Sequence, residues 1–173
     1  MCEKVGLDRF KSSLVLCNFI NDTTMLYTPA ALGAFNISEL NLLNLMRISL
    51  YNGKAMLPKF TSGSNVIEET SIVKPKTAKI IRSALEEALI NGTSRGLKGL
   101  DTLGFKIWNK TGSADEGNGV GCSGLFEYKN EYFLYSLRLE SKNKNVLPFA
   151  SNDALPLLKE ILTTISNLNF LLK

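Results

Sequence analysis

Four consecutive residues, Lys110-Thr111-Gly112-Ser113, combine side chains that could bind a negatively charged ligand. Lys110 supplies a fixed cation for a substrate carboxylate, and Thr111 supplies a hydroxyl group for hydrogen bonding. Gly112 lacks a Cβ atom, so a ligand can lie close against the backbone there. Ser113 follows directly and completes the set. These four residues are our candidate substrate-binding site.

The candidate site stands at the end of a predicted strand. Phe105 and Ile107 form a short alternating apolar run ahead of it, and such alternation is typical of a half-buried strand. Residues 114–121 are acidic and glycine-rich, which predicts a flexible loop after Ser113. Two aromatic-rich segments around a short polar turn then predict a β-hairpin, with strands at 124–128 and 132–139 and a turn at 129–131.

Helical segments surround this predicted sheet. Pro75 and Pro156 each stand where a helix begins, and an Asn-Gly pair follows two of the helical patterns. Helices are predicted at 2–21 (broken), at 39–51 after the N-cap Ser38, at 75–90 and at 153–172, with extended segments at 54–60 and 66–73. Helices followed by antiparallel strands and a closing helix predict an α+β fold, an antiparallel sheet flanked by helices, in a single domain of residues 1–173.

Three strings imitate motifs for other chemistry, and local geometry counts against each. Ser71-Ile72-Val73-Lys74 has Ser-x-x-Lys spacing, but Lys74 precedes a proline and is pushed towards extended geometry, so the two side chains would not share a helical face. Ser141-Lys142-Asn143-Lys144 lies after the candidate site in a polar loop. Residues 104–111 miss a phosphate-binding P-loop by one Asn for Gly, yet their interior is bulky and strand-like.

Composition excludes several classes of function. The chain has a net charge of +4 and no histidine, so Ser-His-Asp, Cys-His and histidine-ligated metal sites are impossible within it. Its positive charges are spread thinly, so we expect no nucleic-acid partner. Cys2, Cys17 and Cys122 stand at unrelated spacings, which predicts buried core residues and no metal site or cofactor. Without a signal peptide or an apolar run long enough to span a membrane, we expect the chain to be cytoplasmic if made alone.

Segments from about Gly6 to about Leu139 follow, in order, the motifs of one enzyme family. Lys-Thr-Gly at a strand end is one of that family's three signature motifs, beside Ser-x-x-Lys and Ser-x-Asn. The other matching segments are Gly6 to Phe10, Pro29 to Ala34, Ile37 to Leu40, Asn52 to Lys54, Leu57 to Phe60, Ala78 to Ala88, Gly92 to Gly96 and Ser123 to Leu125. On these residues the chain resembles the C-terminal half of a class A penicillin-binding transpeptidase domain, of the serine β-lactamase superfamily. Asn109 departs from the pattern, because the family usually has Gly there.

The resemblance implies a partial β-lactamase/transpeptidase-like fold and a role in cross-linking peptidoglycan at the cell envelope. In that family the serine of Ser-x-x-Lys attacks the D-Ala-D-Ala carbonyl, and both motifs absent here precede the Gly6 segment. We therefore identify no catalytic nucleophile in this chain and expect it to be inactive alone. The implied partners are a stem peptide or a β-lactam and the missing upstream half of the domain. A non-catalytic module that binds a peptide or a partner protein through Lys110-Thr111, and a structural domain that no longer uses the site, are the alternatives.

Overall fold

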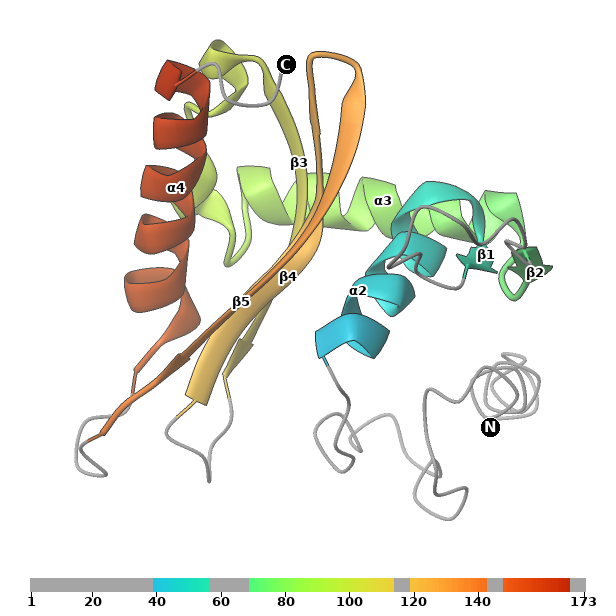
Figure 1. Ribbon diagram of the computed structural model, residues 1–173, viewed down its shortest axis with the longest axis horizontal. Helices are drawn as coiled ribbons and strands as arrows, with labels where there is room; N and C mark the ends of the chain where they lie inside the picture. The colour runs from blue at the N-terminus through green and yellow to red at the C-terminus, as the bar shows by residue number, and fades with distance from the viewer. Residues whose placement is uncertain (1–38, 57–68, 114–118, 143–147, 169–173) are drawn as a thin grey trace, which may run out of the picture. The chain divides into compact units, whose positions relative to one another are not determined.

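The computed structural model of the protein describes residues 39–56, 69–113, 119–142 and 148–168. The chain divides into two compact units, residues 1–78 and 79–173, and each unit has its own sheet. In chain order the labelled elements of Figure 1 are α2 (Glu39–Arg47), β1 (Lys54–Met56), β2 (Glu69–Ser71), α3 (Pro75–Ile90), β3 (Phe105–Ser113), β4 (Gly119–Tyr128), β5 (Glu131–Glu140) and α4 (Leu155–Leu168). This is an α+β architecture, as predicted. The expectation of a single domain stays a prediction.

A glycine ends the helix of the first unit. α2 continues into a wider π-helical turn, and Gly53 closes that turn with a left-handed φ of 80°. A Cβ atom added to Gly53 would lie 1.8 Å from the carbonyl oxygen of Val73, so a larger residue would be both strained and crowded there. The predicted helix and its Asn-Gly stop are therefore confirmed. β1 and β2 then pair antiparallel within the two segments predicted to be extended.

The second unit is built on a three-stranded antiparallel sheet in the order β3-β4-β5. β3 pairs with β4 from Phe105 opposite Tyr128 to Ser113 opposite Val120. Lys129 and Asn130 connect β4 to β5, and both have positive φ, at 52° and 66°. Two such residues are what a tight two-residue hairpin turn requires.

Two sequence expectations about this hairpin were wrong in their boundaries. β4 begins at Gly119, so residues 119–121 belong to the strand and not to the predicted loop. Glycine is depleted in strands, but here it serves close packing, because a Cβ atom on Gly121 would lie 2.6 Å from the carbonyl oxygen of Leu137. The turn contains only Lys129 and Asn130, since Glu131 already pairs with Tyr128.

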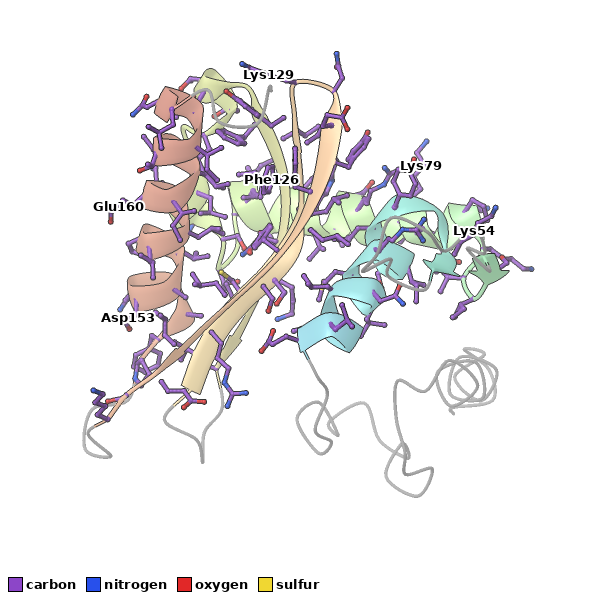
Figure 2. All side chains as sticks on the ribbon, in the orientation of Figure 1. Lys54, Lys79, Phe126, Lys129, Asp153 and Glu160 are labelled. Carbon is purple, nitrogen blue, oxygen red and sulfur yellow. The ribbon has the colours of Figure 1, made fainter. Side chains whose placement is uncertain are left out.

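The core of the second unit lies between the sheet and α4, which runs along one side of it (Figure 1). Because side chains alternate along a strand, the three strands present one apolar face, where Figure 2 shows Phe126 on the side towards α4. Glu160 of α4 points away from the sheet (Figure 2). The buried residues contributed to this core by the sheet and α4 are Phe105, Ile107, Val120, Cys122, Phe126, Tyr128, Leu155, Leu158 and Leu162. Trp108 alternates to the opposite face, where its Nε1 donates to Oε1 of Glu86 on α3, at 2.9 Å.

The remaining helix predictions agree with the structure apart from one start. α3 begins at Pro75, as predicted. α4 begins at Leu155 and has Pro156 in its first turn, but residues 150–154, which include the predicted start at Asp153, form a π-helical turn. The predicted helix at 2–21 lies outside the described residues, as do Ser38 and residues 169–172. None of the helices in the described segments is both long and apolar enough to span a membrane.

Candidate functional site

The four predicted site residues form the end of β3, which is an edge strand among the described strands. Lys110, Gly112 and Ser113 are exposed, and Thr111 is half-buried. By alternation Lys110 and Thr111 leave the strand on opposite faces. The long side chain of Lys110 nevertheless bends back, and its Nζ donates to the carbonyl oxygen of Thr111. The cation is therefore held at the strand edge, next to the backbone of the residue that bears the predicted hydroxyl.

Thr93 also lies at this edge; its segment, Gly92 to Gly96, matched a family motif in the sequence, but Thr93 was not named there as a site residue. Thr93, in the loop after α3, places its Oγ1 2.8 Å from Oγ1 of Thr111, and either hydroxyl could be the donor. Both side chains reach solvent. The Ser113 hydroxyl is set apart from this pair, because it accepts a 3.4 Å hydrogen bond from the backbone N–H of Ala150. The structure thus brings together Lys110, Thr111 and Thr93.

Directly behind the edge lies a buried chain of hydrogen bonds centred on Asn109. Tyr135 donates from its hydroxyl to Oδ1 of Asn109 at 2.7 Å, and Asn109 donates from Nδ2 to Oγ of Ser94 at 2.8 Å. The Ser94 hydroxyl in turn donates to the backbone carbonyl of Asn109 at 3.5 Å. Asn109 is 1% exposed and Ser94 is fully buried. Burial of these polar groups is tolerated because each has a partner.

Burial also fixes the protonation of two side chains on the core face of the sheet. It raises the pKa of the Cys122 thiol from 9.0 to about 11. It raises the pKa of Tyr135 well above 10, with a smaller contribution from the charge of Cys122. At neutral pH both groups are protonated, so Tyr135 keeps the proton that it donates to Asn109. Cys122 is therefore a core residue and not an activated nucleophile.

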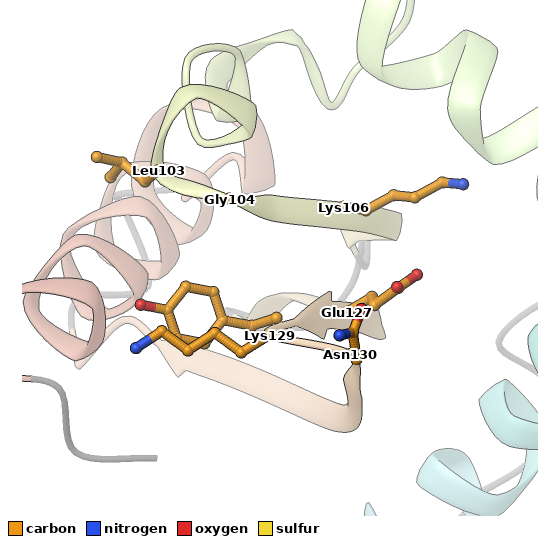
Figure 3. A pocket seen from close by; sticks show the side chains of 7 residues that line it. Leu103, Gly104, Lys106, Glu127, Lys129 and Asn130 are labelled. Atoms are coloured by element: carbon orange, nitrogen blue, oxygen red, sulfur yellow. The ribbon is translucent and has the colours of Figure 1, made fainter. Parts of the chain in front are cut away.

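A separate hollow of about 410 Å³ lies at the opposite end of the β3-β4 pair (Figure 3). Lys129 extends over the ring of Tyr128 there, with its Nζ 5.4 Å from the ring centroid. The residues around the hollow are Leu103, Gly104, Lys106, Glu127, Tyr128, Lys129 and Asn130. None of the four predicted site residues is among them, and the charges are mixed in sign, so we assign this hollow no ligand.

The two Ser-x-x-Lys strings have different outcomes. Ser71 is the last residue of β2, and Lys74 precedes the first residue of α3, so the two do not share a helical face, as predicted. Ser141 follows β5, and the end of its string lies outside the described residues. In the described segments, no group of three or more His, Cys, Asp or Glu side chains is arranged to hold a metal ion.

Comparisons with known proteins add no family assignment. No family model matches the chain, and no curated protein matches it. The resemblance to a transpeptidase domain therefore rests on the motifs in the sequence.

Proposed function

We propose that this chain supplies the carboxylate-binding strand of a penicillin-binding D,D-transpeptidase domain. The observation that carries the proposal is that Lys110-Thr111-Gly112 stands near the end of β3. Among the described strands β3 is at the edge of an antiparallel sheet, and α4 covers one face of that sheet. The ligand would be a peptidoglycan stem peptide ending in D-Ala-D-Ala, or a β-lactam, lying alongside β3. In this proposal the fold is a partial β-lactamase/transpeptidase-like fold.

The edge of β3 has the groups that such a ligand needs. Lys110 can turn its ammonium group from the Thr111 carbonyl to a ligand carboxylate, which is the stronger, charge-assisted partner. The hydroxyl of Thr111 adds a donor. A Cβ atom added to Gly112 would have no atom of the described residues within 4 Å, so the sheet face is open at this position. Because β3 is an edge strand among the described strands, an extended peptide could pair with its backbone.

Acyl transfer needs more than this edge supplies. The reaction requires a serine hydroxyl that loses its proton to a neighbouring base while it attacks the peptide carbonyl, with D-Ala leaving. Ser71 and Lys74 lack the helical geometry for that pairing. In this proposal the nucleophile comes from the other half of the domain, and the present chain binds ligand without forming an acyl-enzyme.

Binding is tested with the full chain and an N-acetylated peptide that ends in D-Ala-D-Ala, by isothermal calorimetry. Lys110→Ala should weaken binding about 10- to 100-fold, because a hydrogen bond to a charged group is lost. Lys106→Ala is the matched control, since Lys106 is an exposed lysine on the same strand and should leave affinity unchanged. Equal binding by the Lys110→Ala variant, or by a peptide with an amidated C-terminus, would contradict the proposal.

A second candidate function is a non-catalytic module that binds a peptide through the same strand. The geometry of Ser71 and Lys74 favours it, because it needs no nucleophile. Mass spectrometry of the intact chain after incubation with a penicillin should show no adduct under either function. An adduct would mean that a serine in this chain is activated, and Ser71 is the first position to map. Acylation of a longer protein that contains this sequence would favour the transpeptidase over the module.

A further inference from the structure

Asn109 occupies an unusual place for a polar side chain. It shares the core-facing side of β3 with Phe105 and Ile107, and it immediately precedes the candidate site. Both ends of its carboxamide are engaged, the oxygen by Tyr135 and the nitrogen by Ser94. Its orientation is therefore set from two sides, by β5 and by the loop after α3.

The sheet is shaped to allow this contact. Gly124 of β4 lies between Asn109 on one neighbouring strand and Tyr135 on the other. A Cβ atom on Gly124 would lie 2.7 Å from the Tyr135 hydroxyl and 2.0 Å from the carbonyl oxygen of Trp108. Glycine at this position leaves the path over β4 open, so the Tyr135 hydroxyl can reach Asn109 two strands away.

On its other side Asn109 anchors the loop that carries Thr93. Ser94 is held by Asn109 through its side chain, and its backbone N–H donates to the carbonyl oxygen of Ala88 at 3.2 Å. Thr93 directly precedes Ser94 in the chain, and its Oγ1 lies 2.8 Å from Oγ1 of Thr111. Thr111 is itself two residues beyond Asn109 on the same face of β3.

We propose that Asn109 is a positioning residue for the carboxylate site, acting through Ser94 to hold the Thr93 and Thr111 hydroxyls together as one paired donor. Each hydroxyl carries one proton. In the ligand-free site one of these two protons forms the hydrogen bond between the threonines. A bound carboxylate can accept hydrogen bonds from both hydroxyls. This inference rests on the proposed function for its ligand, and it adds Thr93, Asn109 and Tyr135 to the residues on which affinity depends.

The first test needs no ligand. In NMR spectra of the full chain, the nuclear Overhauser contact between the Thr93 and Thr111 side chains should be present and should weaken or vanish in Tyr135→Phe and in Asn109→Leu. Tyr132→Phe removes a hydroxyl from an exposed tyrosine on the same strand and should keep the contact. If Asn109→Leu does not fold, Tyr135→Phe decides. A full contact in a folded Tyr135→Phe variant would overturn the positioning role.

The second test uses the D-Ala-D-Ala peptide and separates positioning from simple stabilisation. Tyr135→Phe and Thr93→Val should each weaken binding about 3- to 10-fold, because each removes the use of one hydrogen bond. The double variant should bind no more weakly than the weaker single one, since both changes act on the same hydroxyl pair. Additive losses, or a lower melting temperature with unchanged affinity, would overturn the inference. If the wild-type chain binds no peptide, the proposed function fails, and the Overhauser contact still decides the role of Asn109.

Discussion

At the scale of single residues, two glycines of the same sheet, Gly124 and Gly112, have opposite surroundings. We therefore expect substitution of the first to affect stability and substitution of the second to affect binding. A Cβ atom on Gly124 would collide with backbone at 2.0 Å, whereas one on Gly112 would meet no atom of the described residues within 4 Å. Gly124→Ala should therefore lower the free energy of unfolding by about 1–3 kcal/mol, the usual range for overpacking. Gly112→Ala should leave it unchanged.

Urea denaturation of the two variants checks this prediction, with peptide binding as a second reading. Gly112→Ala should weaken peptide binding while its unfolding midpoint stays at the wild-type value, because the added methyl group occupies space that the ligand would use. Equal unfolding midpoints for Gly124→Ala and wild type would show that the sheet accommodates the methyl group without loss of stability. The contact of Tyr135 with Asn109 would then not require a glycine at position 124.

The buried thiol of Cys122 predicts how the stability of the protein depends on pH. Burial raises the pKa of its thiol to about 11, above the ordinary value of 9.0. Well below pH 9 the thiol is protonated in both the folded and the unfolded chain, so it causes no pH dependence there. As pH rises from 9 towards 11 the unfolded chain releases this proton and the folded chain retains it, so stability falls. Above pH 10 Tyr135 acts in the same direction, because its pKa is also raised.

The measurement is the free energy of unfolding of wild type and Cys122→Ala at several pH values between 7 and 11. At pH 7 the Cys122→Ala variant should have a lower free energy of unfolding than wild type, since it leaves a small cavity in the core. Above pH 9 its free energy of unfolding should fall less steeply with pH, and the difference in slope should correspond to at most about one bound proton. Parallel curves for the two proteins would mean that the thiol ionises as easily in the folded chain as in the unfolded one.

At the scale of elements, the sequence was most informative where a local signal decides the structure. Pro75 and the Asn-Gly pair at 52–53 set helix boundaries through their own backbone preferences, and both boundaries are found as predicted. The start of β4 was missed because its glycines look like loop residues. Their reason for being in a strand is the backbone of β5, which comes near only in the folded sheet.

The sequence likewise predicted the local features of the candidate site but not its long-range contacts. The position of Lys110 and Thr111 at a strand end followed from alternation within β3. The contacts of Asn109 did not, because Tyr135 is 26 residues and Ser94 15 residues away along the chain. One signal was present in the sequence, since a polar Asn109 follows Phe105 and Ile107 on the apolar side of the alternation. Such a residue must find partners when buried, but the sequence does not say which ones.

At the scale of the whole molecule, the two units differ in how much core their described residues contain. In the second unit the sheet, α4 and the segment before β3 that contains Leu97 and Leu100 share one continuous apolar cluster. In the described part of the first unit the buried apolar side chains are Ile48, Leu50 and Ala78. Local opening is easiest where few apolar contacts close over the backbone hydrogen bonds. We therefore expect the two sheets to open with different free energies.

Hydrogen exchange followed by mass spectrometry tests this expectation in the intact chain. Amides of β4, which is paired on both sides, should exchange slowest, and amides of β1 and β2 should exchange about 100-fold faster or more, as a difference of a few kcal/mol in opening free energy implies. Leu162→Ala, which removes a buried side chain of α4, should speed exchange in β3–β5 and leave β1 and β2 unchanged. Exchange at one common rate in both sheets, with all of them responding to Leu162→Ala, would instead show that the two units unfold as one cooperative body.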